Sequence, residues 1–297
     1  MTRRACLLAL SAALSRAAGR LPANKNVKWA LGSNLWNYFP PVPFTDILDV
    51  MRDTGFIGIR LTQFPQILTK YNITAEQMQA EVARRKLQVI TVSFSGQPAE
   101  DASQHEAIMA RAKEAMNYLK RFDANLLVVF SPRGRGQTAE QFRNACKFYN
   151  RLGETALGMG FKAGLHNHLG QMVQTPEEID RFMELTDPKL LFFSPDTAHV
   201  HLGGGDVVKI LEKYKHRLMM ADYKDAKREG LNPEKFLPNI YDLGDGEIDF
   251  PACHRVLKSI SFKSWLCVDL DTARNGIRAS YERCGAYVVD KLEPIYL

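Results

Sequence analysis

Short apolar runs alternate with helix-like segments along most of the chain. Eight runs predict β-strands, at residues 29–36, 58–64, 88–94, 126–131, 162–166, 190–194, 218–222 and 265–269. Segments whose apolar residues recur at helical spacing predict eight intervening helices, at 44–54, 74–86, 103–122, 138–159, 176–186, 206–216, 251–259 and 278–292. Eight alternating strand–helix units are typical of an α/β protein with the (β/α)8 TIM barrel fold. An open doubly wound sheet is the alternative, but its Gly-x-Gly-x-x-Gly turn is absent from the sequence.

The helix at 176–186 has the clearest boundaries in the sequence. Thr175 is placed to cap it, Pro176 takes the first helical position, and Glu178 completes a capping box. Asp187 precedes a proline and ends the segment. No repeat, low-complexity tract or linker divides the chain after the first 22 residues, so we expect one barrel domain over residues 23–297.

The first 22 residues resemble an export leader. Arg3 and Arg4 precede an apolar stretch that runs to Leu14, and small residues follow it. The paired arginines indicate the twin-arginine type, which predicts a periplasmic or secreted protein. An amphipathic N-terminal helix or an uncleaved extension is the alternative, and the protein would then be cytoplasmic.

Charge and cysteine content narrow the range of functions. Removing the four arginines of residues 1–20 from the 39 basic side chains leaves 35 against 33 acidic ones, a net charge of +2. A nearly neutral body gives no electrostatic reason to expect a nucleic-acid partner.

No run of about 18 apolar residues predicts a membrane span. Outside the leader the cysteines form no Cys-x-x-Cys pair, which favours buried free thiols, although an exported protein could form one disulfide.

Acidic and imidazole side chains follow the last four predicted strands. They are His166 and His168 after the fifth strand, Asp196 and His199 after the sixth, Asp222 and Lys224 after the seventh, and Asp269 and Asp271 after the eighth. The carboxyl ends of barrel strands meet at one rim, where TIM barrel active sites lie.

One inward-facing ligand from each of these strands predicts a single metal site, formed by His166, Asp196, Asp222 and Asp269. One imidazole and three carboxylates favour Mn²⁺ or Mg²⁺. Each residue also has an ordinary interpretation. A strand-end aspartate often caps the next helix, and His166 could be a hydrogen-bonded core histidine. Their joint occurrence on four consecutive strands favours a site. His105, His216 and His254 lie on predicted helices and are expected at the surface.

Several motifs around these residues resemble those of the xylose isomerase-like TIM barrel superfamily. They are Gly-Leu-His166-Asn167-His168-Leu-Gly170, Asp196-Thr197-Ala198-His199, Tyr223-Lys224-Asp225 and Gly244-Asp245-Gly246-Glu247-Ile248-Asp249-Phe250. Within it the chain is most similar to the inosose dehydratase branch. The resemblance implies a divalent metal at the ends of strands five to eight, a polyol, ketose or keto-sugar substrate, and proton transfer next to a carbonyl.

Two positions depart from the pattern of this superfamily. Asp222 stands where the strand-seven histidine is expected, and Asp269 replaces the strand-eight glutamate. Aspartate is one methylene shorter, so Asp269 would have to approach the ion more closely or bind it through water. His166 stands at the strand-five glutamate position, as in the dehydratase branch.

These residues predict an isomerase, epimerase or dehydratase mechanism. His166 or His168 would remove a proton next to the carbonyl, and His199 or Lys224 would protonate the other carbon or a departing hydroxyl. Trp36 could stack on the sugar ring or belong to the core. His201 and Asp271 are further candidates for contact with the substrate.

Two other functions are compatible with this barrel. Abasic-site endonucleases of the endonuclease IV type share it, but they need several zinc ions and a basic groove. A non-catalytic sugar-binding relative would have a degenerate metal site. For the leading interpretation we expect a small carbohydrate as the partner, with no nucleic acid and no membrane after leader removal. The sequence is compatible with a homo-oligomer.

Overall fold

Eight parallel strands form a barrel in the computed structural model, which describes residues 22, 27–37 and 42–296. The order is β6-β5-β4-β3-β2-β1-β10-β7, and bridges Phe193–Leu218 and Asp196–Asp222 link β6 to β7 and close the ring. The strands are β1 Lys28–Gly32, β2 Gly58–Leu61, β3 Gln88–Ser95, β4 Leu126–Phe130, β5 Lys162–His166, β6 Leu191–Phe193, β7 Ala221–Tyr223 and β10 Trp265–Val268. The predicted TIM barrel is confirmed. The predicted leader lies outside the described residues, apart from Pro22.

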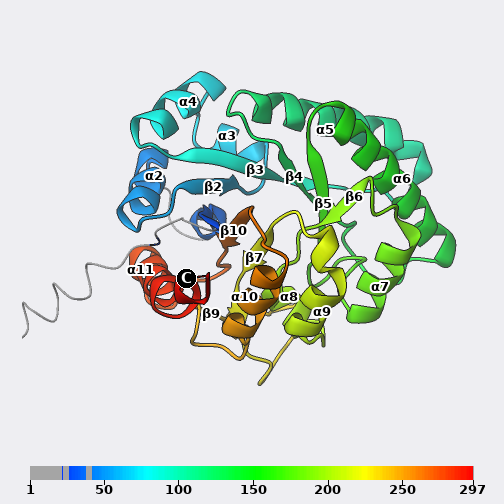
Figure 1. The fold of residues 1–297 in the computed structure, drawn as a ribbon. Helices are drawn as coiled ribbons and strands as arrows, with labels where there is room; N and C mark the ends of the chain where they lie inside the picture. Colours follow the sequence, from blue (N-terminus) through cyan, green and yellow to red (C-terminus); the bar gives the residue numbers. More distant parts are fainter. Residues whose placement is uncertain (1–21, 23–26, 38–41, 297) are drawn as a thin grey trace, which may run out of the picture.

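Helices surround the strands on the outside of the barrel (Figure 1). They are α2 Phe44–Asp53, α4 Ala75–Arg84, α5 His105–Lys120, α6 Ala139–Gly158, α7 Pro176–Leu185, α9 Val207–Tyr214, α10 Phe250–Ser259 and α11 Ile277–Tyr287. Each matches a predicted helix to within a few residues, except that the last ends earlier and continues as a π-helix over Val288–Leu292. Thr175 and Glu178 form the expected capping box at the start of α7.

Several shorter elements were not expected from the sequence. Helices α3 Gln66–Lys70, α8 Thr197–Leu202 and α12 Glu293–Tyr296 are single short turns, and β8 Asp225–Ala226 pairs antiparallel with β9 Ile240–Tyr241. Turns of 3-10 helix cover Asn34–Asn37, Ala102–Gln104, Lys215–Arg217 and Leu237–Asn239.

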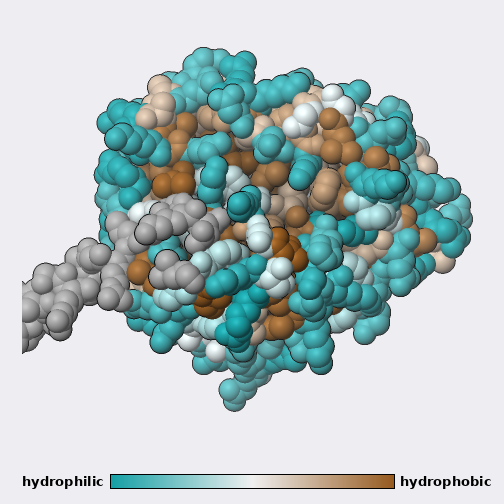
Figure 2. Space-filling view, in the orientation of Figure 1, coloured by the Kyte–Doolittle hydropathy of each residue, from teal (hydrophilic) through white to brown (hydrophobic). Residues whose placement is uncertain are grey.

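The apolar residues form two layers. One large cluster fills the space between strands and helices, and a smaller one fills the barrel interior with Ala30, Ile90, Val128, Met219 and Trp265 among its members. Side chains alternate along a strand, so successive residues enter different layers. The exposed face in Figure 2 is hydrophilic around its edge, with apolar side chains gathered toward the middle. In the part of the chain that is described, no helix is long and apolar enough to cross a membrane.

Two histidines predicted at the surface are buried, and this prediction is wrong. His105 places Nε2 2.9 Å from the carbonyl oxygen of Ala99. His254 is fully buried, stacks on Trp29 and lies within hydrogen-bonding distance of Tyr223. Both rings sit on the inner face of their helices, where tertiary partners satisfy a ring nitrogen. His216 is exposed, as expected.

The four cysteines outside the predicted leader are free thiols, as the sequence favoured, and form no disulfide with one another. Those at positions 146, 253, 267 and 284 are buried free thiols. Burial raises the pKa of Cys146 to about 12, which keeps that thiol protonated and unreactive.

Candidate functional site

The four predicted metal ligands all lie at the carboxyl end of the barrel and are buried. His166 is the last residue of β5, and Asp222 lies within β7. Asp196 follows β6 and also caps α8, because its Oδ1 accepts a hydrogen bond from the backbone N–H of His199. A parallel bridge places Asp196 directly beside Asp222. Asp269 follows β10.

Three of these residues form a compact group. Ligand atoms of His166, Asp196 and Asp222 all lie within 4.8 Å of one another, the one such group that the described residues contain. His166 Nδ1 is 3.1 Å from Asp222 Oδ2, and Nε2 is 3.7 Å from Asp196 Oδ2. Sequence reasoning therefore found a set of acid and imidazole side chains that the fold does bring together.

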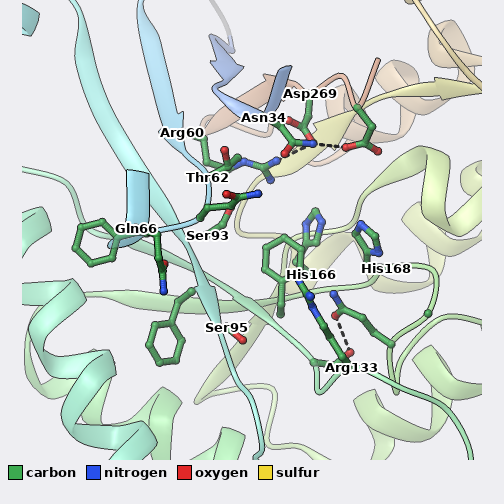
Figure 3. A pocket seen from close by; sticks show the side chains of 18 of the residues that line it. Asn34, Arg60, Thr62, Gln66, Ser93, Ser95, Arg133, His166, His168 and Asp269 are labelled. Carbon is green, nitrogen blue, oxygen red and sulfur yellow. Dashed lines mark hydrogen bonds and ion pairs between the residues drawn. The ribbon is translucent and has the colours of Figure 1, made fainter. Parts of the chain in front are cut away.

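Asp269 is not part of this group. Its Oδ2 lies 2.8 Å from Arg60 Nη2 and 2.8 Å from Lys224 Nζ. Figure 3 shows Asp269 and Arg60 on one side of the cavity and His166 and His168 on another. The aspartate therefore pairs with cations instead of joining the three-residue group.

Two buried cations link the carboxylates of the site. Arg60, from β2, also pairs with Asp222, and Lys224 Nζ lies 3.0 Å from Asp196 Oδ2 and 2.9 Å from Asp271 Oδ2. Sequence reasoning missed Arg60. The signal was a charged residue inside the apolar run Gly-Ile-Arg60-Leu, at a position that faces the barrel axis.

Burial and neighbouring charges set the protonation of the site. Burial raises the pKa of Asp196 and of Asp222 to about 6, although Lys224 and Arg60 oppose the shift. Burial also acts on Asp269, but Arg60 and Lys224 outweigh it and hold its pKa below the usual value. Burial lowers the pKa of His166 to about 3, so its ring is neutral near pH 7.

The rings of His168 and His199 pack against each other beside the group, with centroids 3.7 Å apart and planes tilted by 35°. Burial lowers the pKa of His168 to about 4, and burial also lowers the pKa of His199 well below its usual value. Nδ1 of His168 is 2.6 Å from the carbonyl oxygen of Leu169, which can only accept a hydrogen bond. Nδ1 therefore carries the proton, and Nε2 keeps its lone pair.

A cavity of about 850 Å³ opens onto these residues. Of the predicted site residues, His166, His168, Lys224, Asp269 and Asp271 line it. Asn34, which donates a hydrogen bond to Asp271, and Arg60 line it as well. A volume of this size lies within the range of small-molecule sites.

Five predicted site residues do not line the cavity: Asp196 and Asp222 of the three-residue group, and Trp36, His199 and His201. Trp36 lies in the 3-10 turn after β1 and stacks on Tyr281, so it belongs to the core. His199 is fully buried behind His168. His201 places Nε2 2.9 Å from Glu247 Oε2 at the edge of α8.

The Tyr223-Lys224-Asp225 motif is positioned by hydrogen bonds on both sides. Thr197 Oγ1 accepts a hydrogen bond from the Lys224 N–H at 2.9 Å and lies 3.1 Å from the Asp222 carbonyl oxygen. Asp225 accepts four backbone N–H groups, from residues 226, 244, 246 and 248. A Cβ at Gly246 would overlap the Asp225 carboxylate, so the loop needs glycine there. These contacts hold Lys224 at the barrel axis.

The three-residue group fits a divalent metal. His166 Nδ1 and Asp222 Oδ1 are buried without a hydrogen-bond partner among the described residues, the former despite its short distance to Asp222 Oδ2. Four buried carboxylates (Asp196, Asp222, Asp269 and Asp271) face only two buried cations, which leaves an excess of two negative charges. A divalent ion would neutralise this excess.

Comparison with known proteins supports the same assignment of fold and family. The family described as xylose isomerase-like TIM barrel matches residues 44–285. An inosose dehydratase of Bacillus licheniformis is 31% identical over 73% of this chain and 77% of its own length. An inosose dehydratase of Lactiplantibacillus plantarum is 27% identical over 84% and 90%, respectively.

A solved structure of the IolI protein with a bound zinc atom superposes with a TM-score of 0.76 at 14% identity, covering 91% of this chain and 99% of that one. The structural likeness concerns the fold, and the curated relatives are enzymes, as predicted for this chain. The family match spans most of the described barrel, from α2 into α11. The chain therefore belongs to the xylose isomerase-like TIM barrel family.

Proposed function

We propose that this protein is a divalent-metal-dependent dehydratase, or an isomerase or epimerase of the same chemistry, acting on a keto-sugar or keto-polyol. The observation that carries the proposal is a neutral His168 with a free Nε2, in the same cavity as His166 and Lys224. The curated relatives named inosose dehydratase favour dehydration over isomerisation. An endonuclease with several metals finds less support, since the described residues offer one group of metal ligands.

His166, Asp196 and Asp222 would hold the metal. When bound, the ion would act as a Lewis acid that polarises the substrate carbonyl and acidifies the adjacent C–H. We propose Mn²⁺ or Mg²⁺ as the ion. One imidazole and two carboxylates can bind either of these ions, and they can also bind Zn²⁺, the ion in the IolI structure.

His168 acts as the general base in this proposal. Its Nδ1–H donates to the carbonyl oxygen of Leu169, which fixes the ring orientation and leaves Nε2 free to accept a proton. His199 packs against the His168 ring and lies outside the cavity lining, so it orients His168 and does not contact substrate. A base must lie within hydrogen-bonding reach of the proton it removes, and His168 lines the cavity where the substrate would bind.

Lys224 supplies the proton for the leaving group. Burial alone would lower its pKa, but Asp196, Asp269 and Asp271 outweigh burial and raise it, so the side chain is an ammonium. In dehydration, the electron pair of the broken C–H bond forms the C=C bond while the C–O bond to the β-hydroxyl breaks. The hydroxyl takes a proton from Lys224 and leaves as water, and the substrate proton ends on His168.

The remaining lining suits a polyhydroxylated substrate. Thr62, Ser93, Ser95 and Ser131, which carry hydroxyl groups, line the cavity together with Asn34, which carries an amide. Phenylalanines 64, 94, 130 and 236 supply apolar walls. Sites for small ligands combine apolar walls with a few polar groups that fix orientation.

Solvent-deuterium exchange tests the proposal. Purified protein with Mn²⁺ is incubated in D₂O with a panel of keto-polyols and keto-sugars that includes an inosose, and NMR follows the C–H signal next to the carbonyl. We expect exchange or loss of water with at least one substrate, and a rate about 10²–10⁴ times lower for His168→Gln. His216→Gln, an exposed histidine, is the matched control. Equal rates in His168→Gln and wild type would exclude His168 as the base.

We propose export as well, on the basis of the arginine pair at positions 3 and 4 and the apolar stretch that follows it. The twin-arginine route carries folded proteins, which suits an enzyme that acquires its metal before export. The periplasm or the medium is the proposed location.

A further inference from the structure

Six buried side chains form a closed ring of contacts between acids, cations and an imidazole. In order around the ring they are Asp222, Arg60, Asp269, Lys224, Asp196 and His166, which returns to Asp222. All six are 2% exposed or less. Each cation therefore bridges Asp269 and one carboxylate of the three-residue metal group.

The charges of this ring and Asp271 divide into two balanced sets. Asp269 and Asp271 carry two negative charges, which match the positive charges of Arg60 and Lys224. The carboxylates of Asp196 and Asp222 are left to balance a divalent ion. Because both cations also contact these two carboxylates, a metal ion has to compete with Arg60 for Asp222 and with Lys224 for Asp196.

The two oxygens of Asp269 have different surroundings, and only Oδ2 is held by charged partners. Oδ2 is shared by Arg60 and Lys224, at 2.8 Å from each. Oδ1 lies against Gly32 of β1, where a Cβ would overlap it. Gly32 is in turn fixed by Tyr281, whose hydroxyl donates to the Gly32 carbonyl at 2.7 Å. The short aspartate side chain thus remains on the β1–β2 side of the barrel.

We propose that Asp269 is the counter-ion of Arg60 and Lys224 and not a metal ligand, and that these two cations weaken divalent-metal binding by His166, Asp196 and Asp222. This inference rests on the metal site of the proposed function but not on its substrate or reaction. Arg60 and Lys224 are then positioning residues for the metal, because each attracts a carboxylate that the ion also needs. The site takes up metal weakly, and without metal Arg60 and Lys224 remain in contact with the carboxylates of Asp222 and Asp196.

Two double variants, each of which removes one positive and one negative charge, test the proposal. Arg60→Met/Asp269→Asn removes one cation and its proposed counter-ion. Lys224→Met/Asp196→Asn removes the other cation, Lys224, and a proposed metal ligand, Asp196. Titration calorimetry with Mn²⁺ measures affinity, and the visible absorption of bound Co²⁺ reports the ligand set, both without substrate. We expect the first variant to bind one ion at least as tightly as wild type, with an unchanged Co²⁺ spectrum. We expect the second to lose binding.

The single variants Arg60→Met and Lys224→Gln supply independent arms, so failure of one variant to fold does not remove the test. Each removes a positive charge a few ångströms from the ion and should tighten Mn²⁺ binding by about tenfold or more. Arg60→Lys keeps the charge and is the control. Near-UV circular dichroism checks the fold of every variant.

Three results would overturn the inference. They are loss of metal from Arg60→Met/Asp269→Asn, a changed Co²⁺ spectrum in that variant, and unchanged Mn²⁺ affinity in both single variants. Absence of Mn²⁺ and Co²⁺ binding from wild type and single variants alike would also refute it. By contrast, metal binding as described, without exchange or turnover of any keto-polyol, would contradict the proposed function and leave this inference standing.

Discussion

Asp225→Asn is expected to destabilise the loop that carries Lys224. Oδ1 of Asp225 accepts the N–H groups of Ala226 and Ile248, at 2.9 and 3.2 Å. Oδ2 accepts those of Gly244 and Gly246, at 2.9 and 3.0 Å. Asparagine replaces one oxygen with an NH₂ group, which cannot accept a hydrogen bond. Two of the four N–H groups therefore lose their acceptor.

The structure sets the size of the effect. The Gly244 and Gly246 N–H groups are only partly buried, so the asparagine NH₂ is least costly on their side. An N–H group left without an acceptor costs about 1–3 kcal/mol, and the lower half of that range applies where water can reach it. We expect the free energy of unfolding to fall by about 2–4 kcal/mol, which includes the loss of the charge-assisted bonds.

Urea denaturation followed by tryptophan fluorescence measures this change. Asp245→Asn is the matched control, because it makes the same substitution in the same loop. The Asp245 carboxylate pairs with Arg283 at the surface and accepts no backbone N–H in the described structure, so the control should lose less than about 1 kcal/mol. If the two variants differ by less than about 0.5 kcal/mol, the four hydrogen bonds of Asp225 do not hold the loop.

The remaining predictions concern acid stability, the positioning of Lys224 and export. Burial lowers the pKa of His254 to about 4, whereas the unfolded side chain titrates near 6.5, so the unfolded state binds the extra proton and stability is lost as pH falls through this window. His254→Phe should therefore lose about 2 kcal/mol less than wild type between pH 7 and pH 4.5 in urea unfolding, and equal losses would contradict the burial of a neutral ring. Thr197→Val removes the acceptor of the Lys224 N–H and should cost about 1–3 kcal/mol and lower turnover, while Thr197→Ser should retain both; matching melting curves for the two would show that this bond is dispensable. Arg3→Lys/Arg4→Lys should leave the protein in the cytoplasm, as judged by immunoblots of cell fractions, and an unchanged distribution would rule out the twin-arginine route.

The barrel could be predicted from the sequence because the signals for its strands and helices are local. Apolar runs, capping residues and prolines act within a few neighbours, so the strand at Lys162–His166 and the capping box of α7 were placed correctly. The register of acids and imidazoles at the strand ends is also local, and parallel strands must bring those ends to one rim. The meeting of His166, Asp196 and Asp222 followed from these two facts.

The roles of the longer and more distant side chains depended on the tertiary structure. Arg60 lies 162 residues from Asp222, and only the closed barrel shows that its guanidinium reaches across to that carboxylate. The separation of Asp269 from the metal group likewise depends on its ion pair with Arg60, a residue of a distant strand. The burial of His254 depends on how α10 is rotated against β7. Hydrophobic periodicity records which face of an element is covered, but not which partner a charged side chain meets across the barrel. Long-range electrostatic pairing is a property of the folded chain, and it decided the chemistry of this site.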